Sequence, residues 1–353
     1  MDTRIARAYP EIGDATIVDC HLNLFVDPEA VVAELPAEMA AKGFSPVHEQ
    51  WPSPITAVRD EITDPSDPAG AVERHLNPWG VDRAILTGDP RVVAGGVQPD
   101  SRYAAALMEA TNAWIANTWF PADDRFLGSI LVNPRAPEAA VESIRRWGGH
   151  PRMVQVLMTA AGQVGFGDRR YWPIYEAATN FGLPVGLLAG AEGHGVANPN
   201  TGAGYPNSAI ERQSVIPANA MGQLLNMLLE GPFVEFPDLS VAFLGTGYSW
   251  LAPFLWRIDK AWKGLTDDYP WLEQPPSAYA AEHVRIVTAR FNEGGDSEQS
   301  ERMVEMIDRE VPLLFGSNYP FAHGLTDEES LQLLPPDTAE AALGSRAMSF
   351  YGL

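Results

Sequence analysis

The chain has 353 residues, of which 46% are hydrophobic and 20% are charged, a composition typical of one large globular domain. The 46 acidic residues outnumber the 24 basic ones, and the net charge of -22 would repel a phosphate backbone, which argues against a nucleic-acid partner. No stretch reaches the roughly 18 apolar residues of a membrane span, and residues 1–19 carry charges where a signal peptide needs an apolar core. We therefore expect a cytoplasmic protein with no membrane partner.

Short apolar runs alternate with helical patterns along most of the chain, which is typical of β/α units around a parallel sheet. The runs predict strands at residues 16–25, 83–87, 126–132, 153–158, 184–189, 240–244, 284–288 and 313–315. Eight such strands are the number that a closed parallel barrel requires. We therefore predict an α/β fold, a (β/α)8 TIM barrel, as a single domain over residues 1–353.

The predicted helices and two irregular segments fall between these strands. Apolar periodicity predicts helices at 102–119, 137–147 and 171–181. Segment 27–82 is long and rich in proline, so we expect an insertion with helical pieces that covers the barrel mouth. Segment 191–208, rich in Gly, Asn and Pro, follows the fifth predicted strand. It should help to build a pocket, because the loops after barrel strands form the active-site face.

Two residue types are too scarce to support certain chemistries. Cys20 is the only cysteine, which excludes an intramolecular disulfide framework and a cysteine-cluster metal site. Its apolar strand predicts that the side chain is a small buried hydrophobe. Lysine occurs only at Lys42, Lys260 and Lys263, so a Schiff-base mechanism is hard to place.

Several motifs occur in the order known from one family. Segments 172–178 and 182–185, segment 236–241, and the string Gly316-Ser317-Asn318-Tyr319-Pro320 resemble the strand-4 to strand-5 passage, the sixth strand and the strand-8 motif of the amidohydrolase-related family. The branch that they indicate contains aminocarboxymuconate-semialdehyde decarboxylase and related decarboxylases and hydrolases. The resemblance, from residue 19 to residue 322, implies a barrel enzyme, a hydrolase or a lyase, that acts on a small molecule and forms homodimers.

The same resemblance implies a divalent metal ion at the strand ends, but the chain lacks most of the expected ligands. His21 matches the first histidine of the family's His-x-His motif, and Asn23 replaces the second. Leu188 and Gly245 stand where the family has ligands on strands 5 and 6, and Asn318 replaces the strand-8 aspartate. Leucine and glycine offer no donor atom, and an amide oxygen is a poor, neutral ligand for Zn²⁺. We therefore predict a degenerate site with no metal and no other cofactor.

His21, Asn23 and Asn318 are the predicted catalytic residues. At the C-terminal end of the first strand, the His21 imidazole would face the barrel mouth and act as an acid or a base near neutral pH. Alternatively, it fills the space of the lost ion and only hydrogen-bonds to an asparagine. The two amides would hold a carbonyl or carboxylate of the substrate, or else satisfy one another in a buried polar cluster.

Further residues near the predicted strand ends are candidates for substrate binding. They are His194, Tyr248, Trp250, Arg290 and His323. His194 lies between glycines that let the backbone approach a ligand, unless it is a plain surface residue. Tyr248 and Trp250 would form an aromatic wall or pack the next helix. Arg290, like Arg212, would bind a carboxylate or lie in solvent, and His323 would contact the substrate or cap the last loop.

Three functions remain open. In the first, a metal-independent enzyme acts on a small cyclic or aromatic carboxylate with His21 as acid or base, by decarboxylation, hydrolysis, or a related lyase or isomerase step. In the second, the chain is a catalytically silent paralogue that binds a ligand or pairs with an active family member. In the third, a non-standard site, for example an oxygen-only Mg²⁺ site from Asp19, Asp89 or Glu192, supports a metal-dependent hydrolase or decarboxylase.

Overall fold

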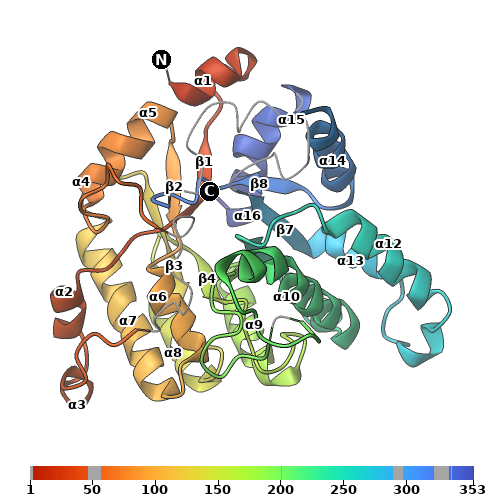
Figure 1. The fold of residues 1–353 in the computed structure, drawn as a ribbon, viewed down its shortest axis with the longest axis horizontal. Helices are drawn as coiled ribbons and strands as arrows, with labels where there is room; N and C mark the ends of the chain where they lie inside the picture. Colours follow the sequence, from red (N-terminus) through yellow and green to blue (C-terminus); the bar gives the residue numbers. More distant parts are fainter. Residues whose placement is uncertain (1–2, 47–56, 200, 289–296, 322–333, 335) are drawn as a thin grey trace.

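Eight parallel β-strands form one sheet whose order follows the chain, and helices surround it (Figure 1). The computed structural model describes residues 3–46, 57–199, 201–288, 297–321, 334 and 336–353. The strands are β1 (Val18–Leu22), β2 (Arg83–Leu86), β3 (Phe126–Leu131), β4 (Met153–Thr159), β5 (Val185–Leu188), β6 (Val241–Leu244), β7 (Val284–Thr288) and β8 (Leu313–Phe315). The predicted (β/α)8 barrel is confirmed. Its strands read as short apolar runs because both faces of the sheet are covered.

The barrel closes between β1 and the segment that follows β8. Leu22 forms a parallel bridge with Tyr319. The backbone N–H of Asn318 donates to the carbonyl of His21 at 2.9 Å, and the N–H of Asn23 donates to the carbonyl of Tyr319 at 2.7 Å. This seam brings the three predicted catalytic residues to one place.

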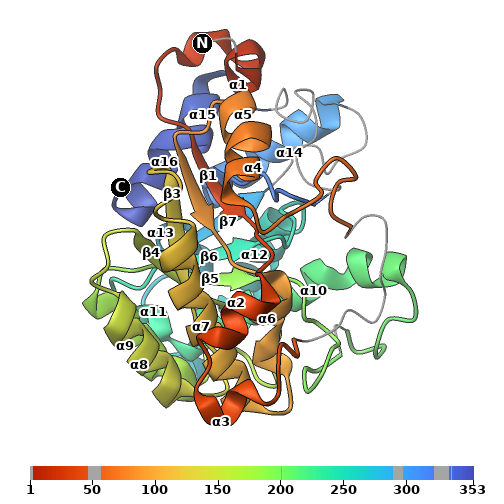
Figure 2. The same ribbon diagram turned by 90° about the vertical axis from the view of Figure 1, so that its left-hand side faces the viewer.

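Helices connect successive strands and pack around the barrel (Figures 1 and 2). They are α1 (Arg4–Ala8), α2 (Pro28–Ala33), α3 (Ala37–Ala40), α4 (Pro68–Ala71), α5 (Asn77–Trp79), α6 (Pro90–Val93), α7 (Ser101–Thr118), α8 (Pro137–Trp147), α9 (Trp172–Asn180), α10 (Ala209–Glu230), α11 (Pro232–Glu235), α12 (Leu251–Trp262), α13 (Pro276–His283), α14 (Ser297–Glu310), α15 (Pro336–Glu340) and α16 (Arg346–Tyr351). The predicted helices at 102–119, 137–147 and 171–181 correspond to α7, α8 and α9.

Helix α10 is a long element that the sequence pattern did not predict. It contains Pro217, and a proline in the interior of a pattern argues against a helix because it removes a backbone donor. The signal that marks its start is local. The Ser208 side chain accepts from the backbone N–H of Glu211 at 3.3 Å, and Ser followed three residues later by Glu is a capping signature.

The insertion at 27–82 contains helical pieces, as predicted, and its α2 packs on α7 at the flank of the barrel (Figure 2). Val58 pairs in antiparallel fashion with Phe321, and the N–H of Arg59 donates to the carbonyl of Pro320 at 3.1 Å. This part of the insertion therefore contacts the segment after β8. That the insertion covers the barrel mouth stays a prediction.

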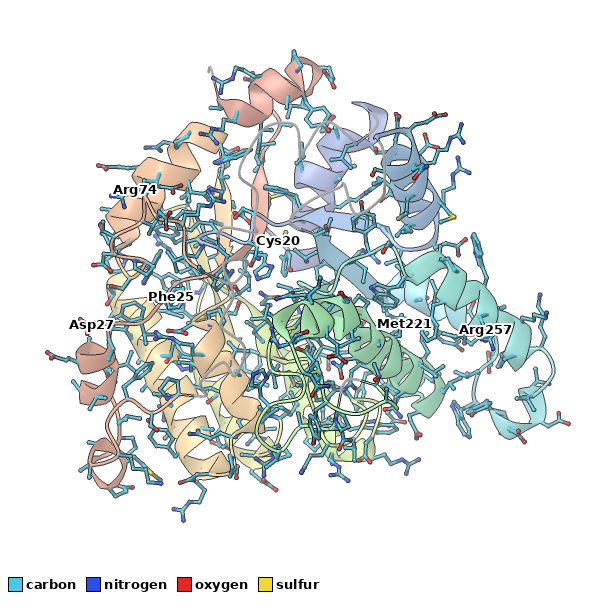
Figure 3. The ribbon with its side chains drawn as sticks, in the orientation of Figure 1. Cys20, Phe25, Asp27, Arg74, Met221 and Arg257 are labelled. Atoms are coloured by element: carbon cyan, nitrogen blue, oxygen red, sulfur yellow. The ribbon has the colours of Figure 1, made fainter. Side chains whose placement is uncertain are left out.

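Cys20 lies near the centre of the molecule, whereas Asp27 and Arg257 lie at its periphery (Figure 3). Burial raises the pKa of the Cys20 thiol well above its usual value, so it stays protonated and packs as a small hydrophobe. In the part of the chain that the structure describes, no helix is both long and apolar enough to cross a membrane.

Candidate active site

A cavity of about 260 Å³ opens where β1, β5 and β6 end, next to the seam after β8. Its lining combines residues that follow strand ends with residues from α6 and α10. The described lining residues are His21, Asn23, Phe25, Pro90, Arg91, Ala94, Leu188, Ala189, Gly190, His194, Arg212, Gln213, Ile216, Gly245, Asn318 and Phe321. This is the end of a barrel at which barrel enzymes carry their active sites.

His21 lies deep in this cavity, with 3% of its surface exposed. Two glycines make room for it. A Cβ atom at Gly316 would lie 2.6 Å from the Cβ of His21, closer than such atoms approach one another, so position 316 requires glycine. A Cβ atom at Gly245 would lie 3.6 Å from Cε1 of the imidazole. Gly316 therefore lies against the Cβ and backbone N of His21, and Gly245 borders its imidazole.

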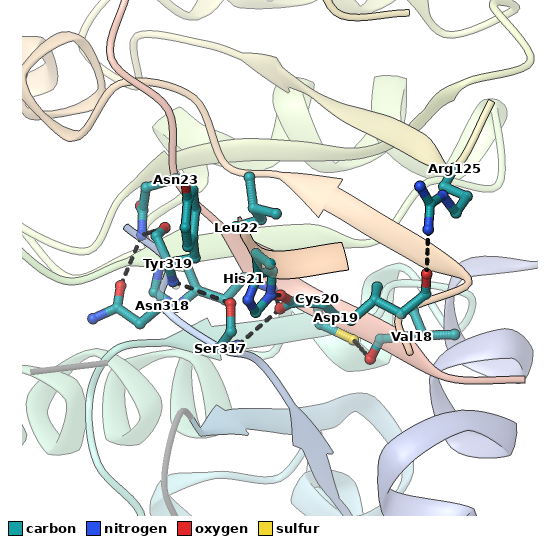
Figure 4. Close-up of polar contacts among 12 residues, drawn as sticks. Val18, Asp19, Cys20, His21, Leu22, Asn23, Arg125, Ser317, Asn318 and Tyr319 are labelled. Atoms are coloured by element: carbon teal, nitrogen blue, oxygen red, sulfur yellow. Dashed lines mark hydrogen bonds and ion pairs between the residues drawn. The ribbon is translucent and has the colours of Figure 1, made fainter. Parts of the chain in front are cut away.

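Asn23 and Asn318 hydrogen-bond to each other across the seam (Figure 4). Nδ2 of Asn23 donates to Oδ1 of Asn318 at 2.7 Å and to the carbonyl of Tyr319 at 3.2 Å. The Thr87 hydroxyl donates to Oδ1 of Asn23 at 3.0 Å. Asn318 has a φ of 54°, in the left-handed region that asparagine tolerates better than most residues. The amides thus contact one another, as one of the two interpretations of the sequence proposed, and both also line the cavity.

Asp19 supports His21 and the seam from within the barrel (Figure 4). Its buried carboxylate accepts from the backbone N–H of His21 at 3.0 Å, from that of Ser317 at 2.8 Å and from Nε2 of His75 at 2.8 Å. Burial alone would raise the pKa of Asp19, but the hydrogen bonds from His75 and Ser317 outweigh it and lower the pKa. The ionised side chain thus joins β1 to the segment after β8.

His75 completes this buried group from η2 (Val72–Leu76), a π-helical turn between α4 and α5. Its ring stacks on Tyr319 with 5.0 Å between ring centroids. Nδ1 of His75 is buried without a hydrogen-bond partner among the described residues. Because the Asp19 carboxylate can only accept, Nε2 of His75 is the donor in the contact between them.

The donor atoms around His21 do not fit a divalent metal site of the family type. Leu188 ends β5 and Gly245 follows β6, so both positions line the cavity without a ligating side-chain atom. The side-chain oxygens of Asn23 and Asn318 already accept hydrogen bonds. Within the described ranges, no group of three His, Cys, Asp or Glu side chains is placed to hold a metal ion.

The three acidic residues considered for an oxygen-only site have other partners. Asp19 holds the seam, and Asp89 caps α6 and pairs with Arg91 at 2.6 Å. Glu192 accepts from the backbone N–H of Gly190 at 2.8 Å. The three carboxylates lie on different elements, and the described lining of the cavity includes none of them.

The charged side chains among the described lining residues are basic, although the chain as a whole has a net charge of -22. The Arg91 guanidinium pairs with Asp89 and lies 4.8 Å from the ring centroid of Phe25. Arg212 follows the start of α10, is 4% exposed, and donates to the carbonyl of Gly190. A cavity with arginines and without a described carboxylate offers favourable electrostatics to an anion.

The rest of the lining is largely apolar. The rings of Phe25 and Phe321 meet edge to face with 5.8 Å between centroids, and Ile216 and Leu188 also line the cavity. Such a wall buries the face of a ring, while the few polar groups set its orientation.

Not all of the predicted substrate-binding residues lie at this cavity. His194 does, and it is buried. Tyr248 and Trp250 are absent from the described lining, because Tyr248 is buried in the core and the Trp250 indole donates to the carbonyls of Thr246 and Gly247. They therefore do not form the predicted aromatic wall of this cavity. Arg290 and His323 lie outside the described residues.

The sequence pattern did not predict that Phe25 and Phe321 form the aromatic wall of the cavity, or that Arg91 lines it. Phe25 follows β1, and Phe321 lies beyond the seam. Arg91 follows β2 in the string Asp89-Pro90-Arg91. The position of Arg91 shortly after a strand was a signal that it faces the active-site end, because polar residues after barrel strands gather there.

The (β/α)8 barrel, with a cavity at the C-terminal ends of its strands, has the architecture of barrel enzymes. A family model described as amidohydrolase matches residues 18–353. The chain therefore belongs to the amidohydrolase family, which confirms the resemblance of its motifs. No curated protein matches the chain in sequence.

Solved structures share this fold at low sequence identity. One is 5-carboxyvanillate decarboxylase from Novosphingobium aromaticivorans with manganese and 4-hydroxy-3-methoxy-5-nitrobenzoic acid, with a TM-score of 0.70, 15% identity, and coverage of 98% of this chain and 97% of that chain. A second is a dihydroxybenzoic acid decarboxylase from Polaromonas sp. JS666 with manganese and the inhibitor 2-nitroresorcinol. Its TM-score is 0.69 at 16% identity, and the match covers 96% of this chain and 97% of that chain. A third is 2,6-dihydroxybenzoate decarboxylase from Rhizobium. Its TM-score is 0.64 at 18% identity, and the match covers 96% of this chain and 99% of that chain.

Proposed function

We propose that the chain is a metal-independent decarboxylase of small aromatic acids. The observation that carries this proposal is the composition of the cavity: a buried imidazole, two arginines and an apolar wall, with no carboxylate among its described lining residues. Structural neighbours that act on aromatic acids are consistent with this substrate class.

Substrate binding follows from the charges of the lining. The guanidinium of Arg212 would attract the carboxylate of the substrate, and Arg91 would add to the positive field. The Phe25 and Phe321 rings would cover the aromatic ring of the substrate and exclude water. Because the products carry no carboxylate, they lose the attraction to Arg212 and leave the site more readily.

The chemical step needs one proton at the ring carbon that bears the carboxylate. His21, as imidazolium, would donate this proton, and the C–C bond to the carboxylate would then break. The electron pair of that bond returns to the ring, CO₂ leaves, and His21 regains its proton from water. A hydroxyl group ortho or para to the carboxylate would raise the electron density at this carbon, so hydroxy-aromatic acids are the preferred substrates.

The asparagine pair would orient the reacting group. Asn23 and Asn318 line the cavity beside His21, and amides offer both donors and acceptors to the carboxylate and to a ring hydroxyl. These groups are neutral, so they guide the carboxylate without stabilising its charge as strongly as a cation does.

A panel of mono- and dihydroxybenzoates, with purified protein, tests the proposal. We expect release of CO₂ with formation of the matching phenol, and no reaction with the corresponding benzamides. If several hydroxybenzoates bind but none is turned over, the chain is a ligand-binding paralogue rather than an enzyme. Hydrolysis of the benzamides would instead indicate the amide hydrolysis for which the family is named.

A further inference from the structure

Glu192 is a buried carboxyl group next to the cavity that the proposed reaction does not use. It is 1% exposed, and its Oε2 accepts from the backbone N–H of Gly190 at 2.8 Å. Its Oε1 is buried without a hydrogen-bond partner among the described residues. A buried carboxylate normally has donors for both oxygens, so this half-satisfied group calls for an explanation.

Glu192 organises residues that do line the cavity. The backbone of Gly190 links the two charged residues, because its N–H donates to Glu192 and its carbonyl accepts from Arg212. The backbone carbonyl of Glu192 lies 3.2 Å from Nδ1 of His194. Gly190, His194 and Arg212 all face the ligand space, so Glu192 lies directly behind the group of residues that an anionic ligand would meet.

Arg212 acts on the charge of Glu192 but does not decide it alone. Burial raises the pKa of Glu192 above its usual value, and the positive charge of Arg212 and the Gly190 N–H offset only part of this rise. The other titratable group on this loop is His194, whose pKa is lowered by burial and by the same Arg212. A ligand carboxylate beside Arg212 would bring a second negative charge close to Glu192, because Glu192 and Arg212 both hydrogen-bond to Gly190.

We propose that Glu192 takes up a proton when an aromatic carboxylate binds, so that the protein accepts its ligand as an anion together with one proton. The Arg212 guanidinium then pairs with the ligand carboxylate, and Glu192 stays as a neutral acid. A neutral carboxyl group with one unsatisfied position costs less to bury than a carboxylate in the same place. The inference rests on the proposed carboxylate site and adds to it a proton acceptor that the decarboxylation itself does not require.

Two consequences follow from proton linkage. The affinity for the ligand falls as the pH rises, by at most about tenfold per pH unit for one linked proton. Binding also takes a proton from the buffer, so the heat of binding depends on the ionisation enthalpy of the buffer. Glu192→Gln keeps an oxygen that can accept from Gly190 but cannot be ionised, so in this variant the contribution of Glu192 to both effects should disappear.

The experiment is isothermal titration of the full chain with benzoate, in buffers of different ionisation enthalpy between about pH 5 and 8. Benzoate is the probe because it lacks the ring hydroxyl that the proposed reaction needs. Glu192→Gln is compared with His194→Gln, which removes the other titratable group of this loop, and circular dichroism of both variants verifies that they are folded.

We expect wild type and His194→Gln to take up more protons with benzoate than Glu192→Gln, whose remaining uptake is at most that of His21 in the same cavity. Proton uptake in Glu192→Gln equal to that of wild type, or uptake that is reduced in His194→Gln alone, would overturn the inference and leave the carboxylate site intact. Pure pH-independent binding by wild type would overturn it as well. If benzoate does not bind to wild type at any pH, the proposed carboxylate site itself is wrong, and the inference is wrong with it.

Discussion

Asn23 donates from its side-chain Nδ2 to Oδ1 of Asn318 at 2.7 Å, which joins β1 to the segment after β8 at the place where the barrel closes. The family motifs lead one to expect a histidine and an aspartate at these two positions. Two amides can face each other there without a cation between them, because one supplies the donor and the other the acceptor. A carboxylate at the same place would need another partner to balance its charge.

The conformation of Asn318 leads to a prediction about stability. Asn318→Ala and Asn318→Gly both remove the hydrogen bond to Asn23, worth about 1 kcal/mol. A φ of 54° costs alanine conformational free energy, whereas glycine adopts it freely. We expect Asn318→Ala to be less stable than Asn318→Gly by about 0.5–1 kcal/mol in urea unfolding. Equal stabilities would show that the backbone at this position is not held in the left-handed region.

His21 is predicted to be essential for turnover and not for folding. His21→Gln keeps a polar side chain of similar size but cannot act as an acid near neutral pH. We expect the rate of CO₂ release to fall by about a hundredfold to ten-thousandfold, with little change in melting temperature. His150→Gln, a substitution outside the described cavity lining, is the matched control and should keep full activity. A fully active His21→Gln enzyme would remove His21 from the mechanism.

Arg212 is predicted to determine the affinity for the carboxylate. Loss of a charge-assisted hydrogen bond costs about 1.5–3 kcal/mol, so Arg212→Gln should raise KM for an aromatic acid by about ten- to a hundredfold. Arg212→Lys should recover part of this loss, because it restores the charge without the planar donor geometry. The control is Arg145→Gln, on the exposed face of α8, which should leave KM unchanged. An unaltered KM in Arg212→Gln would contradict the proposed binding mode.

Asp19 leads to a prediction about stability and pH. Because its folded-state pKa is below the unfolded value, the carboxylate stabilises the fold above the unfolded pKa, and this contribution is lost as the pH falls through the folded pKa. Asp19→Asn should lower the free energy of unfolding at neutral pH by about 2 kcal/mol or more, because charged hydrogen bonds to Ser317 and His75 are lost.

The difference between wild type and Asp19→Asn should shrink below about pH 4, because the carboxyl takes up a proton first in the unfolded chain and only at a lower pH in the folded protein. Urea unfolding of both proteins over this range is the measurement. Asp14→Asn, an exposed residue before β1, is the control and should behave like wild type. A difference that stays constant down to the lowest pH would mean that Asp19 is not ionised in the folded protein.

Much of the fold could be predicted from the sequence because buried parallel strands leave short apolar runs between helical segments. The cavity lining was predictable where a polar residue lies at or just after the end of a strand, as at His21, Asn23 and Asn318, whose catalytic roles stay predictions. It was not predictable where a residue's direction depends on tertiary packing. Trp250 follows β6 in the sequence, but its indole bonds to the preceding turn.

Helix α10 shows a second limit of the sequence. Its interior Pro217 conceals a helix that brings Arg212 and Ile216 to the cavity. Arg212 was therefore only one of several possible carboxylate ligands before its position was known. Homodimer formation, pairing with an active paralogue and roles for Arg290 and His323 stay predictions.

The most direct test of metal-independent decarboxylation is to measure bound metal and CO₂ release on the same sample, before and after chelator treatment. The donor set around His21 predicts metal well below one ion per chain and a rate of CO₂ release that the chelator does not change. About one tightly bound Mn²⁺ or Zn²⁺ per chain, with activity that is lost on its removal and restored on its return, would contradict this account.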